Sequence, residues 1–151
     1  MAPTLHWRWA RFADLGVDDL YDLLALRCRV FILEQGPYLD PDGVDRQAWH
    51  LLGRDEAGQA RAGLRLVDAG VKYAEPSLGR VVLDQPLRGS GLADALVARG
   101  LAHSDALWPG RGNRISAQAH LQRFYGRHGY VPVALPYLED DIPHIEMWRP
   151  S

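Results

Sequence analysis

The sequence predicts one domain of mixed α/β class, spanning residues 1–151. A chain of 151 residues fits a single domain and can bury a core without disulfides or a structural metal. Hydrophobic residues make up 47% of the chain and charged residues 24%, which is an ordinary globular composition. Apolar periodicity gives the element order β-α-β-β-β-α-β-α-β-β, without the strict alternation of a doubly wound fold.

A strand and a helix open the chain. Residues 5–12 alternate apolar and polar side chains, which is the period of a half-buried strand. Asp18 and Asp19 then begin an amphipathic helix, because acidic residues favour a helix N-terminus and the apolar residues that follow have the 3.6-residue period. The helix must end by residues 36–37, Gly-Pro, and a polar, turn-rich loop over residues 38–46 follows it.

A hairpin is predicted next. Its strands are residues 48–53 and 60–67, and the turn signal Asp-Glu-Ala-Gly at residues 55–58 lies between them. In the second strand Arg61 and Arg65 alternate with apolar residues, which is typical of a strand with one polar face.

The most informative junction is the glycine-rich turn at residues 86–93, between a β-branched strand over residues 79–83 and a helix. Gly89 and Gly91 let another group approach the backbone, and the N–H groups of a helix N-terminus favour an anion. The turn lacks the third glycine of a dinucleotide fingerprint. A nucleophile elbow needs glycines two residues before and after the serine, where Ser90 has Arg88 and Leu92. Taken alone, the pattern also fits an ordinary tight turn.

The C-terminal third completes the sheet. Residues 114–119 predict a strand, and residues 120–127 predict a short helix that Gly129 closes as a C-cap. Residues 130–138 and 142–148 predict two final strands.

The charges exclude several classes of function. The formal net charge is −2, so no broad basic surface for nucleic acid is expected. All but one of the 17 basic residues are arginine, and the one lysine, Lys72, lacks the neighbours of a P-loop. The 6 histidines show no zinc-binding motif, so no metal site is predicted.

The single cysteine and the absence of long apolar runs bear on location. Cys28 cannot form an internal disulfide and is expected to be a buried small hydrophobe inside the first helix. No apolar run approaches the roughly 18 residues of a membrane span, and the N-terminus lacks the h-region of a secretory signal. We therefore expect a cytoplasmic protein with no membrane partner.

Two motifs resemble the GNAT superfamily of N-acetyltransferases. Arg-Gly-Ser-Gly-Leu-Ala at residues 88–93 is similar to its acyl-CoA pyrophosphate motif, Q/R-x-x-G-x-G/A, and residues 121–130 are similar to its F-Y-x-x-x-G-F segment. Further segments resemble the ElaA branch of that superfamily: residues 26–35, 37–45, 117–122 and 142–145. The resemblance extends from Trp7 to Met147.

The resemblance implies both a fold and an activity. The fold would be that of an acyl-CoA N-acyltransferase, with a central mixed, mostly antiparallel, splayed sheet flanked by helices. The activity would be direct transfer of an acetyl group from acetyl-CoA to an amine of a small molecule or protein in a ternary complex, without a metal. A homodimer is compatible with the superfamily. Two alternatives stay open: a non-catalytic acyl-CoA-binding or regulatory module, and an acyltransferase akin to acyl-homoserine-lactone synthases.

The resemblance also implies which residues bind acetyl-CoA. Backbone N–H groups of the glycine-rich turn would hold the pyrophosphate, and the preceding strand edge would hydrogen-bond the pantetheine arm. The implied cofactor-binding residues are Val81, Val82, Leu83, Arg88, Gly89, Ser90, Gly91, Leu92, Ala93 and Gln118. Tyr125 falls at the position of the family's general acid, where a phenol would protonate the departing CoA thiolate.

An acceptor ammonium must lose a proton before it attacks, so a base is needed. The candidates are His120, His144, Glu34 and, less favoured, Glu146. Histidine suits neutral pH because an unperturbed imidazole titrates near ~6.5. Each candidate also has a structural interpretation, since His120 begins a short helix and Glu34 can pair with an arginine.

Two acidic loops border the expected acceptor side. If their carboxylates converge, they would favour a cationic acceptor such as a polyamine or a protein amine; if not, they are solvated turns. These residues are Asp40, Asp42, Asp45, Glu139, Asp140 and Asp141. Asp141 stands where the ElaA branch commonly has glycine.

Overall fold

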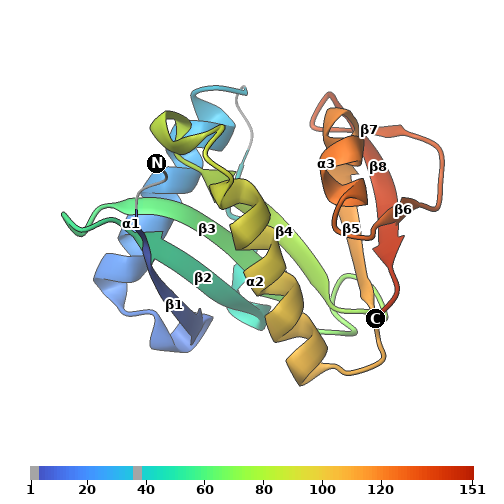
Figure 1. Ribbon diagram of the computed structural model, residues 1–151, viewed down its shortest axis with the longest axis horizontal. Helices are drawn as coiled ribbons and strands as arrows, with labels where there is room; N and C mark the ends of the chain where they lie inside the picture. The colour runs from blue at the N-terminus through green and yellow to red at the C-terminus, as the bar shows by residue number, and fades with distance from the viewer. Residues whose placement is uncertain (1–3, 36–38) are drawn as a thin grey trace.

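The computed structural model describes residues 4–35 and 39–151 and places the strands in two four-stranded sheets (Figure 1). The first sheet has the order β1-β2-β3-β4, with β1 (His6–Arg11), β2 (Ala48–Arg54), β3 (Ala60–Val67) and β4 (Ser77–Leu83). The second has the order β5-β8-β6, and β7 also pairs with β8; its strands are β5 (Asn113–Gln118), β6 (Val131–Pro132), β7 (Tyr137–Glu139) and β8 (Ile142–Arg149). Every pairing within the two sheets is antiparallel.

Helices cover both faces of the first sheet. In Figure 1, α2 (Leu92–Leu107) crosses one face and α1 (Val17–Arg27) lies on the other, while α3 (Gln122–Gly126) lies beside β5. A π-helical turn, Cys28–Ile32, continues α1, and short 3-10 turns cover Phe12–Asp14, Val44–Gln47, Gln85–Leu87 and Ala119–Leu121. No helix of the described residues is long and apolar enough to cross a membrane.

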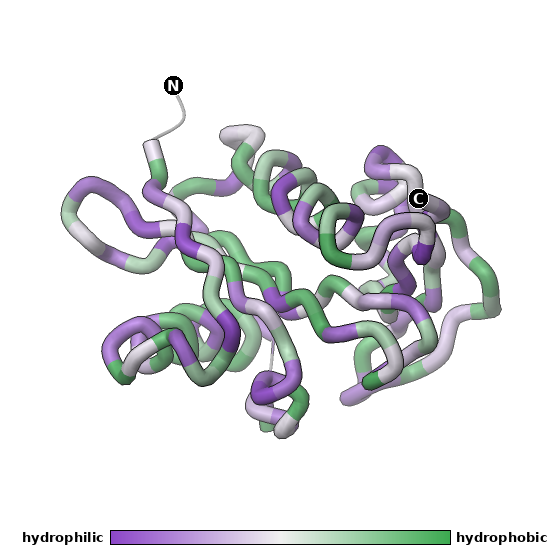
Figure 2. Tube along the Cα trace, turned by 90° about the horizontal axis from the view of Figure 1, so that it is seen from below, coloured by the Kyte–Doolittle hydropathy of each residue, from purple (hydrophilic) through white to green (hydrophobic). Residues whose placement is uncertain are grey.

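The first sheet is buried on both faces, because successive residues of a strand point to opposite sides. In β2, Leu51 packs in the cluster under α2 and its neighbour Leu52 packs in the cluster under α1. Hydrophobic stretches accordingly run through the central strands, while hydrophilic stretches lie in the peripheral turns (Figure 2). Gly100 permits the close approach of α2, since a Cβ there would meet Leu64 Cδ2 and Leu78 Cδ2 at 2.9 Å.

Two predictions about burial were wrong. Arg65, predicted on a polar strand face, is only 1% exposed because carboxylates inside the domain pair with it. Cys28, predicted to be buried, is exposed. The buried residues around it, Leu26, Arg27 and Val30, follow the helical period, and Cys28 lies on the opposite side of the helix.

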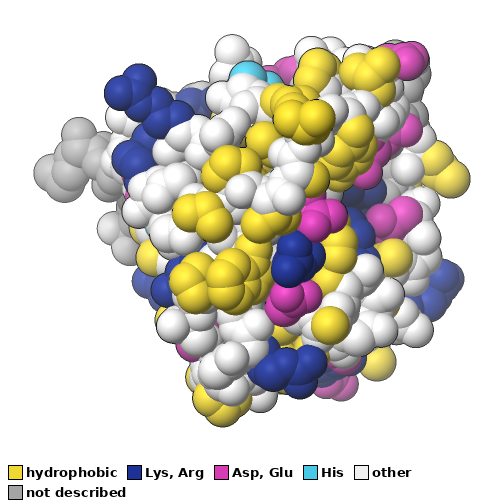
Figure 3. Space-filling view, turned by 90° about the vertical axis from the view of Figure 1, so that its right-hand side faces the viewer, with side chains coloured by type: hydrophobic (Ala, Val, Ile, Leu, Met, Phe, Trp, Pro, Cys, Tyr) yellow, Lys and Arg dark blue, Asp and Glu magenta, His cyan; other side chains and the backbone are white. Residues whose placement is uncertain are grey.

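The predicted strand over residues 130–138 is broken into β6 and β7. Pro132 and Pro136 lack the N–H group that a continuous ladder needs. The segment leaves large hydrophobic side chains exposed, including Val131, Leu135 and Leu138. Hydrophobic side chains are visible across this outer face of the second sheet, which faces the viewer in Figure 3.

The two sheets meet where β4 and β5 begin. The Arg114 N–H donates to the Pro76 carbonyl (3.1 Å), and the Leu78 N–H donates to Asn113 Oδ1 (3.1 Å). From this end the two strands run in the same direction and diverge (Figure 1). The expected splayed arrangement is therefore a V between β4 and β5.

The Asn113 side chain joins the elements at the closed end of the V through hydrogen bonds. Its side chain is fully buried, and its amide Nδ2 donates to Ser104 Oγ of α2 (3.2 Å). Its Oδ1 accepts from the Tyr130 hydroxyl (2.6 Å) as well as from the Leu78 N–H. One amide thus joins β4, β5, α2 and the segment that leads into β6.

We expect Asn113→Ala to destabilise the protein strongly. A buried polar group left without its partner costs roughly 1–3 kcal/mol, and the substitution leaves three such groups. A loss of about 3 kcal/mol would lower Tm by roughly 6–12 °C in a chain of this size. Tyr130→Phe removes one of the hydrogen bonds and should cost about 1 kcal/mol. Urea unfolding measures both, with exposed Gln122→Ala as the control; an Asn113→Ala variant as stable as that control would contradict this role.

Candidate functional site

A cleft of about 440 Å³ occupies the open end of the V between β4 and β5. Side chains from the α1 end, the glycine-rich turn, α3 and the β7–β8 hairpin complete its walls. Most of the residues predicted for the site line this cleft: Glu34, Val81, Leu83, Arg88, Gly89, Ala93, Gln118, His120, Tyr125 and His144. The fold therefore brings residues that are far apart in the sequence to the walls of one cleft.

Four predicted cofactor-binding residues do not line the cleft. The Val82 side chain points to the opposite face of β4 and packs in the cluster under α1. Ser90 uses its hydroxyl to donate to the Leu87 carbonyl inside the turn. Gly91 and Leu92 form the start of α2, behind the cleft wall. Their contribution to a ligand site would come from backbone groups rather than side chains.

A β-bulge in β4 aims consecutive residues into the cleft. Gly63 of β3 lies opposite Val82, and Arg65 lies opposite Gly79, so β4 contains one extra residue between these pairs. Arg80 occupies this position with a φ of 47°, in the left-handed region that disfavours a non-glycine residue. Gly79, Arg80 and Val81 all line the cleft, which a regular strand with alternating side chains does not allow.

An ion-pair network holds Arg80, the extra residue of the bulge, in place. The Arg80 guanidinium approaches Asp40, with Nε 2.9 Å from Oδ1, and its Nη2 donates to the Asp40 carbonyl (2.9 Å). Arg27 and Arg65, each 1% exposed, pair with neighbouring carboxylates of the same loop. The network comprises Arg27, Asp40, Asp42, Asp45, Arg65 and Arg80.

The network corrects the expectation that the first acidic loop attracts a cationic acceptor. Burial alone would raise the pKa of Asp42, but its hydrogen bonds to Arg65, the charges of Arg65 and Arg80 and the hydrogen bond from the Val44 N–H together outweigh burial and hold that pKa well below its usual range. The pKa of Asp45 is likewise lowered, since its hydrogen bonds to Arg27 and Arg65 and the charges of both arginines together exceed the opposing effect of burial. These carboxylates are ionised and neutralised inside the protein. Of the second acidic loop, Glu139 and Asp140 line the cleft.

Arg88 lies within the glycine-rich turn, and its side chain forms an ion pair with Glu34. Its Nη1 and Nη2 donate to the two carboxylate oxygens of Glu34 at 2.7 and 3.1 Å, and its Nε donates to the Leu83 carbonyl (3.2 Å). This bidentate pair fixes Arg88 across the cleft from the end of α1. It also engages Glu34, which makes Glu34 a weaker candidate base than the sequence indicated.

The glycine-rich turn leaves room for a ligand against its backbone. Gly89 and Gly91 have φ values of 80° and 85°, and a Cβ at either position would meet nothing within 4 Å. α2 follows directly, and no side chain caps its first N–H groups. A 16-residue helix therefore presents the positive end of its dipole at the turn. This arrangement fits a pyrophosphate group.

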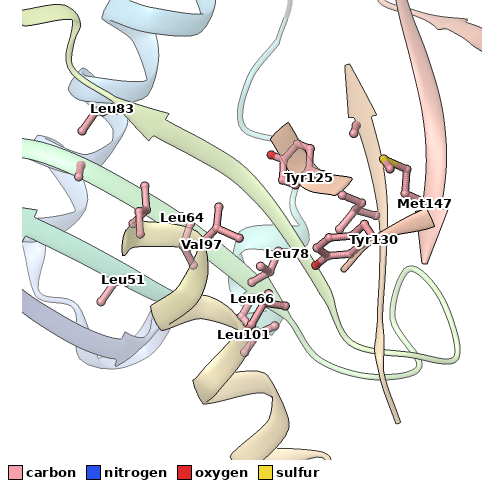
Figure 4. Close-up of a cluster of buried hydrophobic side chains, with 14 of the residues drawn as sticks. Leu51, Leu64, Leu66, Leu78, Leu83, Val97, Leu101, Tyr125, Tyr130 and Met147 are labelled. Atoms are coloured by element: carbon pink, nitrogen blue, oxygen red, sulfur yellow. The ribbon is translucent and has the colours of Figure 1, made fainter. Parts of the chain in front are cut away.

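Tyr125 is a buried phenol on the wall of the cleft. Its residue is 8% exposed, and its ring packs edge-on against Phe124 and Tyr130, with centroids 5.1 and 5.7 Å away. In Figure 4 its oxygen points away from Tyr130. Burial raises the pKa of Tyr125 to about 12, so the phenol carries its proton at neutral pH. The alternative of a hydroxyl in bulk water does not match this burial.

His144 has the geometry of a proton acceptor. Its Nδ1 lies 2.7 Å from the Ile142 carbonyl, and because a carbonyl only accepts, Nδ1 carries the proton. Nε2 then has a free lone pair and lies 3.4 Å from Glu139 Oε2, which would stabilise an imidazolium. His120 is an exposed residue at the cleft wall. Glu146 pairs with Arg114 at 2.9 Å instead.

Gln118 reaches across the cleft to the segment that follows the π-helical turn Cys28–Ile32. Its Nε2 donates to Gln35 Oε1 at 2.8 Å, and both residues line the cleft. The sequence also missed Lys72 and Ser116, which line the cleft from segments without a recognisable motif. No group of three or more histidine, cysteine or acidic side chains in the described part of the chain could hold a metal ion.

Comparisons with known proteins agree with this arrangement. A family model described as an acetyltransferase (GNAT) domain matches residues 51–149. A UPF0039 protein of Synechocystis sp. is 42% identical over 144 residues, which covers 95% of this chain and 94% of that protein. Protein ElaA of Escherichia coli is 37% identical over 148 residues, covering 96% of each chain.

Solved structures confirm the predicted fold. The crystal structure of an acyl-CoA N-acyltransferase from Pseudomonas aeruginosa aligns with a TM-score of 0.91 and 44% identity, covering 97% of this chain and 99% of that one. The crystal structure of Escherichia coli ElaA aligns with a TM-score of 0.89 and 36% identity, with the same coverage of both chains.

The bulge predicts an unusual order of stability at position 80. Glycine normally destabilises a strand relative to alanine by about 0.5–1 kcal/mol. At the left-handed position of Arg80, alanine keeps the strain whereas glycine removes it, so Arg80→Gly should be more stable than Arg80→Ala by about 1 kcal/mol. Urea unfolding of both variants tests this, with Arg8→Gly and Arg8→Ala in β1, whose register with β2 is regular, as the matched pair. If the alanine variant is more stable than the glycine variant at both positions, the result would argue against the bulge.

Proposed function

This chain belongs to the GNAT acetyltransferase family, and we propose that it transfers the acetyl group of acetyl-CoA to the amine of a small molecule or protein. The observation that carries the proposal is one cleft that has an open anion-binding turn at one end and a protonated, buried tyrosine on its wall. It is an acyltransferase by family. The proposal includes a cytoplasmic location and a reaction that needs no metal.

The chain's backbone supplies most of the binding contacts for acetyl-CoA. The N–H groups from Arg88 to Ala93 hold the pyrophosphate at the start of α2. Val81 and Leu83 face the cleft beyond the bulge, so the edge of β4 is available to hydrogen-bond the pantetheine arm. Gln118 lies on the facing strand, where it contacts the same arm. When bound, acetyl-CoA supplies the activated acetyl thioester.

Tyr125 acts as the general acid. The phenol passes its proton to the sulfur as the carbon–sulfur bond breaks, so that a neutral CoA thiol leaves. Burial raises the pKa of Tyr125 to about 12, above the ~8.5 of an ordinary thiol, so the phenol is protonated when the thioester is attacked and regains a proton from the acceptor nitrogen after the transfer. Overall, the nitrogen–carbon bond forms, the carbon–sulfur bond breaks, and one proton of the neutral amine ends on the CoA sulfur.

His144 is the proposed base. Its Nε2 accepts the proton that an incoming ammonium must lose, while the Ile142 carbonyl holds Nδ1–H and so fixes the tautomer. Glu139 stabilises the resulting imidazolium from 3.4 Å. His120 is the second choice, because it reaches the same cleft from an exposed position.

We expect Tyr125→Phe to lower kcat by roughly 10²- to 10⁴-fold, the usual contribution of a general acid. The measurement is CoA thiol release from acetyl-CoA with a panel of amines. Acetyl-CoA binding should survive, since the hydroxyl is not part of the pyrophosphate site. A ligand at 100 times its Kd stabilises a protein by about 2.7 kcal/mol, so a thermal shift checks this point. Exposed Tyr21→Phe is the matched control.

Two outcomes would contradict the proposed acetyl transfer, and a third would contradict only the role of Tyr125. Acetyl-CoA binding without transfer to any amine would favour the non-catalytic module. Transfer only from an acyl carrier protein would favour the acyl-homoserine-lactone-synthase alternative. Full activity of Tyr125→Phe would leave the transfer but remove the assigned acid.

A further inference from the structure

The cations that line the cleft differ in whether they are paired. Arg65, Arg80 and Arg88 each lie within 3 Å of a carboxylate oxygen, at 2.8, 2.9 and 2.7 Å. Lys72 also lines the cleft, but it forms no ion pair within 4.0 Å in residues 4–35 and 39–151. Lys72 is thus the cleft cation whose charge the described part of the protein leaves unmatched.

Lys72 lies in the loop between β3 and β4, at the end of the cleft away from the glycine-rich turn. The residue is exposed overall, and its Nζ lies 5.9 Å from the centre of the Tyr73 ring. Partial desolvation of the ammonium by the surrounding cleft and the like charge of Arg65 lower the pKa of Lys72, and the charge of Glu139 opposes them. An anion bound beside Nζ would offset both unfavourable effects on the ammonium.

Acidic groups line the same cleft. Glu139 and Asp140 come from the β7–β8 hairpin, and the charge of Glu139 raises the pKa of Lys72. Glu139 contacts His144, the proposed base, at 3.4 Å. Asp140 is exposed and forms no ion pair among the described residues. An unmatched ammonium and a carboxylate pair beside the base therefore line one cleft.

We propose that the acceptor carries a carboxylate next to its amine, as an amino acid does, and that Lys72 binds this carboxylate. Its ammonium group would then face Glu139 and Asp140, where His144 can remove a proton. Such an acceptor complements both charges, whereas a polyamine would place a cation beside Lys72 and a purely anionic ligand would face two carboxylates. The inference rests on the proposed acetyl transfer and assigns Lys72 to acceptor specificity rather than to the chemical step.

The test compares acceptors that differ only at the carboxylate. Several amino acids, their amides and their decarboxylated amines are assayed by CoA release at saturating acetyl-CoA. The wild type should prefer the amino acids in kcat/KM. Lys72→Met should reduce that preference about 10- to 100-fold, mainly through KM, because a hydrogen bond to a charged group is lost. Lys72→Arg should keep most of it. Arg99→Met, outside the cleft, controls for net charge.

Binding gives the same contrast without turnover. Amino acids titrated into protein saturated with CoA should raise Tm in the wild type and not in Lys72→Met. The inference is overturned if amides and amines perform as well as amino acids, or if Lys72→Met affects all acceptors equally. In both cases acetyl transfer itself still stands, since CoA release continues.

Two further results would also overturn the inference. A preference for an aminoalkylphosphonate over the amino acid of the same skeleton would point to a phosphate-type ligand. Lys72 is the one lysine of the chain, so an intact mass that gains an acetyl group in the wild type but not in Lys72→Met would make Lys72 itself the acceptor.

Discussion

The buried amide of Asn113 joins the two sheets, and the site depends on where that junction stops. It bonds β4, α2 and Tyr130 at the closed end of the V. Beyond it, β4 and β5 share no ladder among the described residues, so their edges separate and a cleft opens between them. Each strand edge there keeps backbone groups that another molecule can use. A continuous sheet would have filled this space with its own hydrogen bonds.

The ion-pair network holds the β4 bulge beside the cleft. Three arginines and three aspartates connect α1, the loop over residues 40–45, β3 and the β4 bulge. Buried ion pairs contribute little net stability, but a buried charge left without its partner is strongly destabilising, so the network enforces one arrangement of these segments. That arrangement includes the left-handed conformation of Arg80. The strained residue Arg80 and its network partner Arg65 therefore form part of the cleft wall.

The sequence predicted those parts of the site that are formed by residues close together in the chain. Gly89, Gly91 and Tyr125 were predicted because a turn, a helix start and a short motif are local patterns. The ion-pair network was not predicted, since Arg27 and Asp45, or Arg65 and Asp42, meet only after folding. Periodicity placed Arg65 on a polar face, and the tendency of free cysteines to be buried misplaced Cys28. Lys72 carried no motif, so only the fold shows that it reaches the cleft.

The central claim is that acetyl-CoA binds where β4 and β5 diverge. Amide hydrogen exchange with and without acetyl-CoA tests it most directly, because backbone N–H groups are the proposed contacts. Exchange should slow at residues 81–83 and 88–93, and residues around Asn113 should change little because they are already buried. Slower exchange confined to another surface, such as the groove between α3 and β6, or unchanged exchange with ligand bound, would contradict the account.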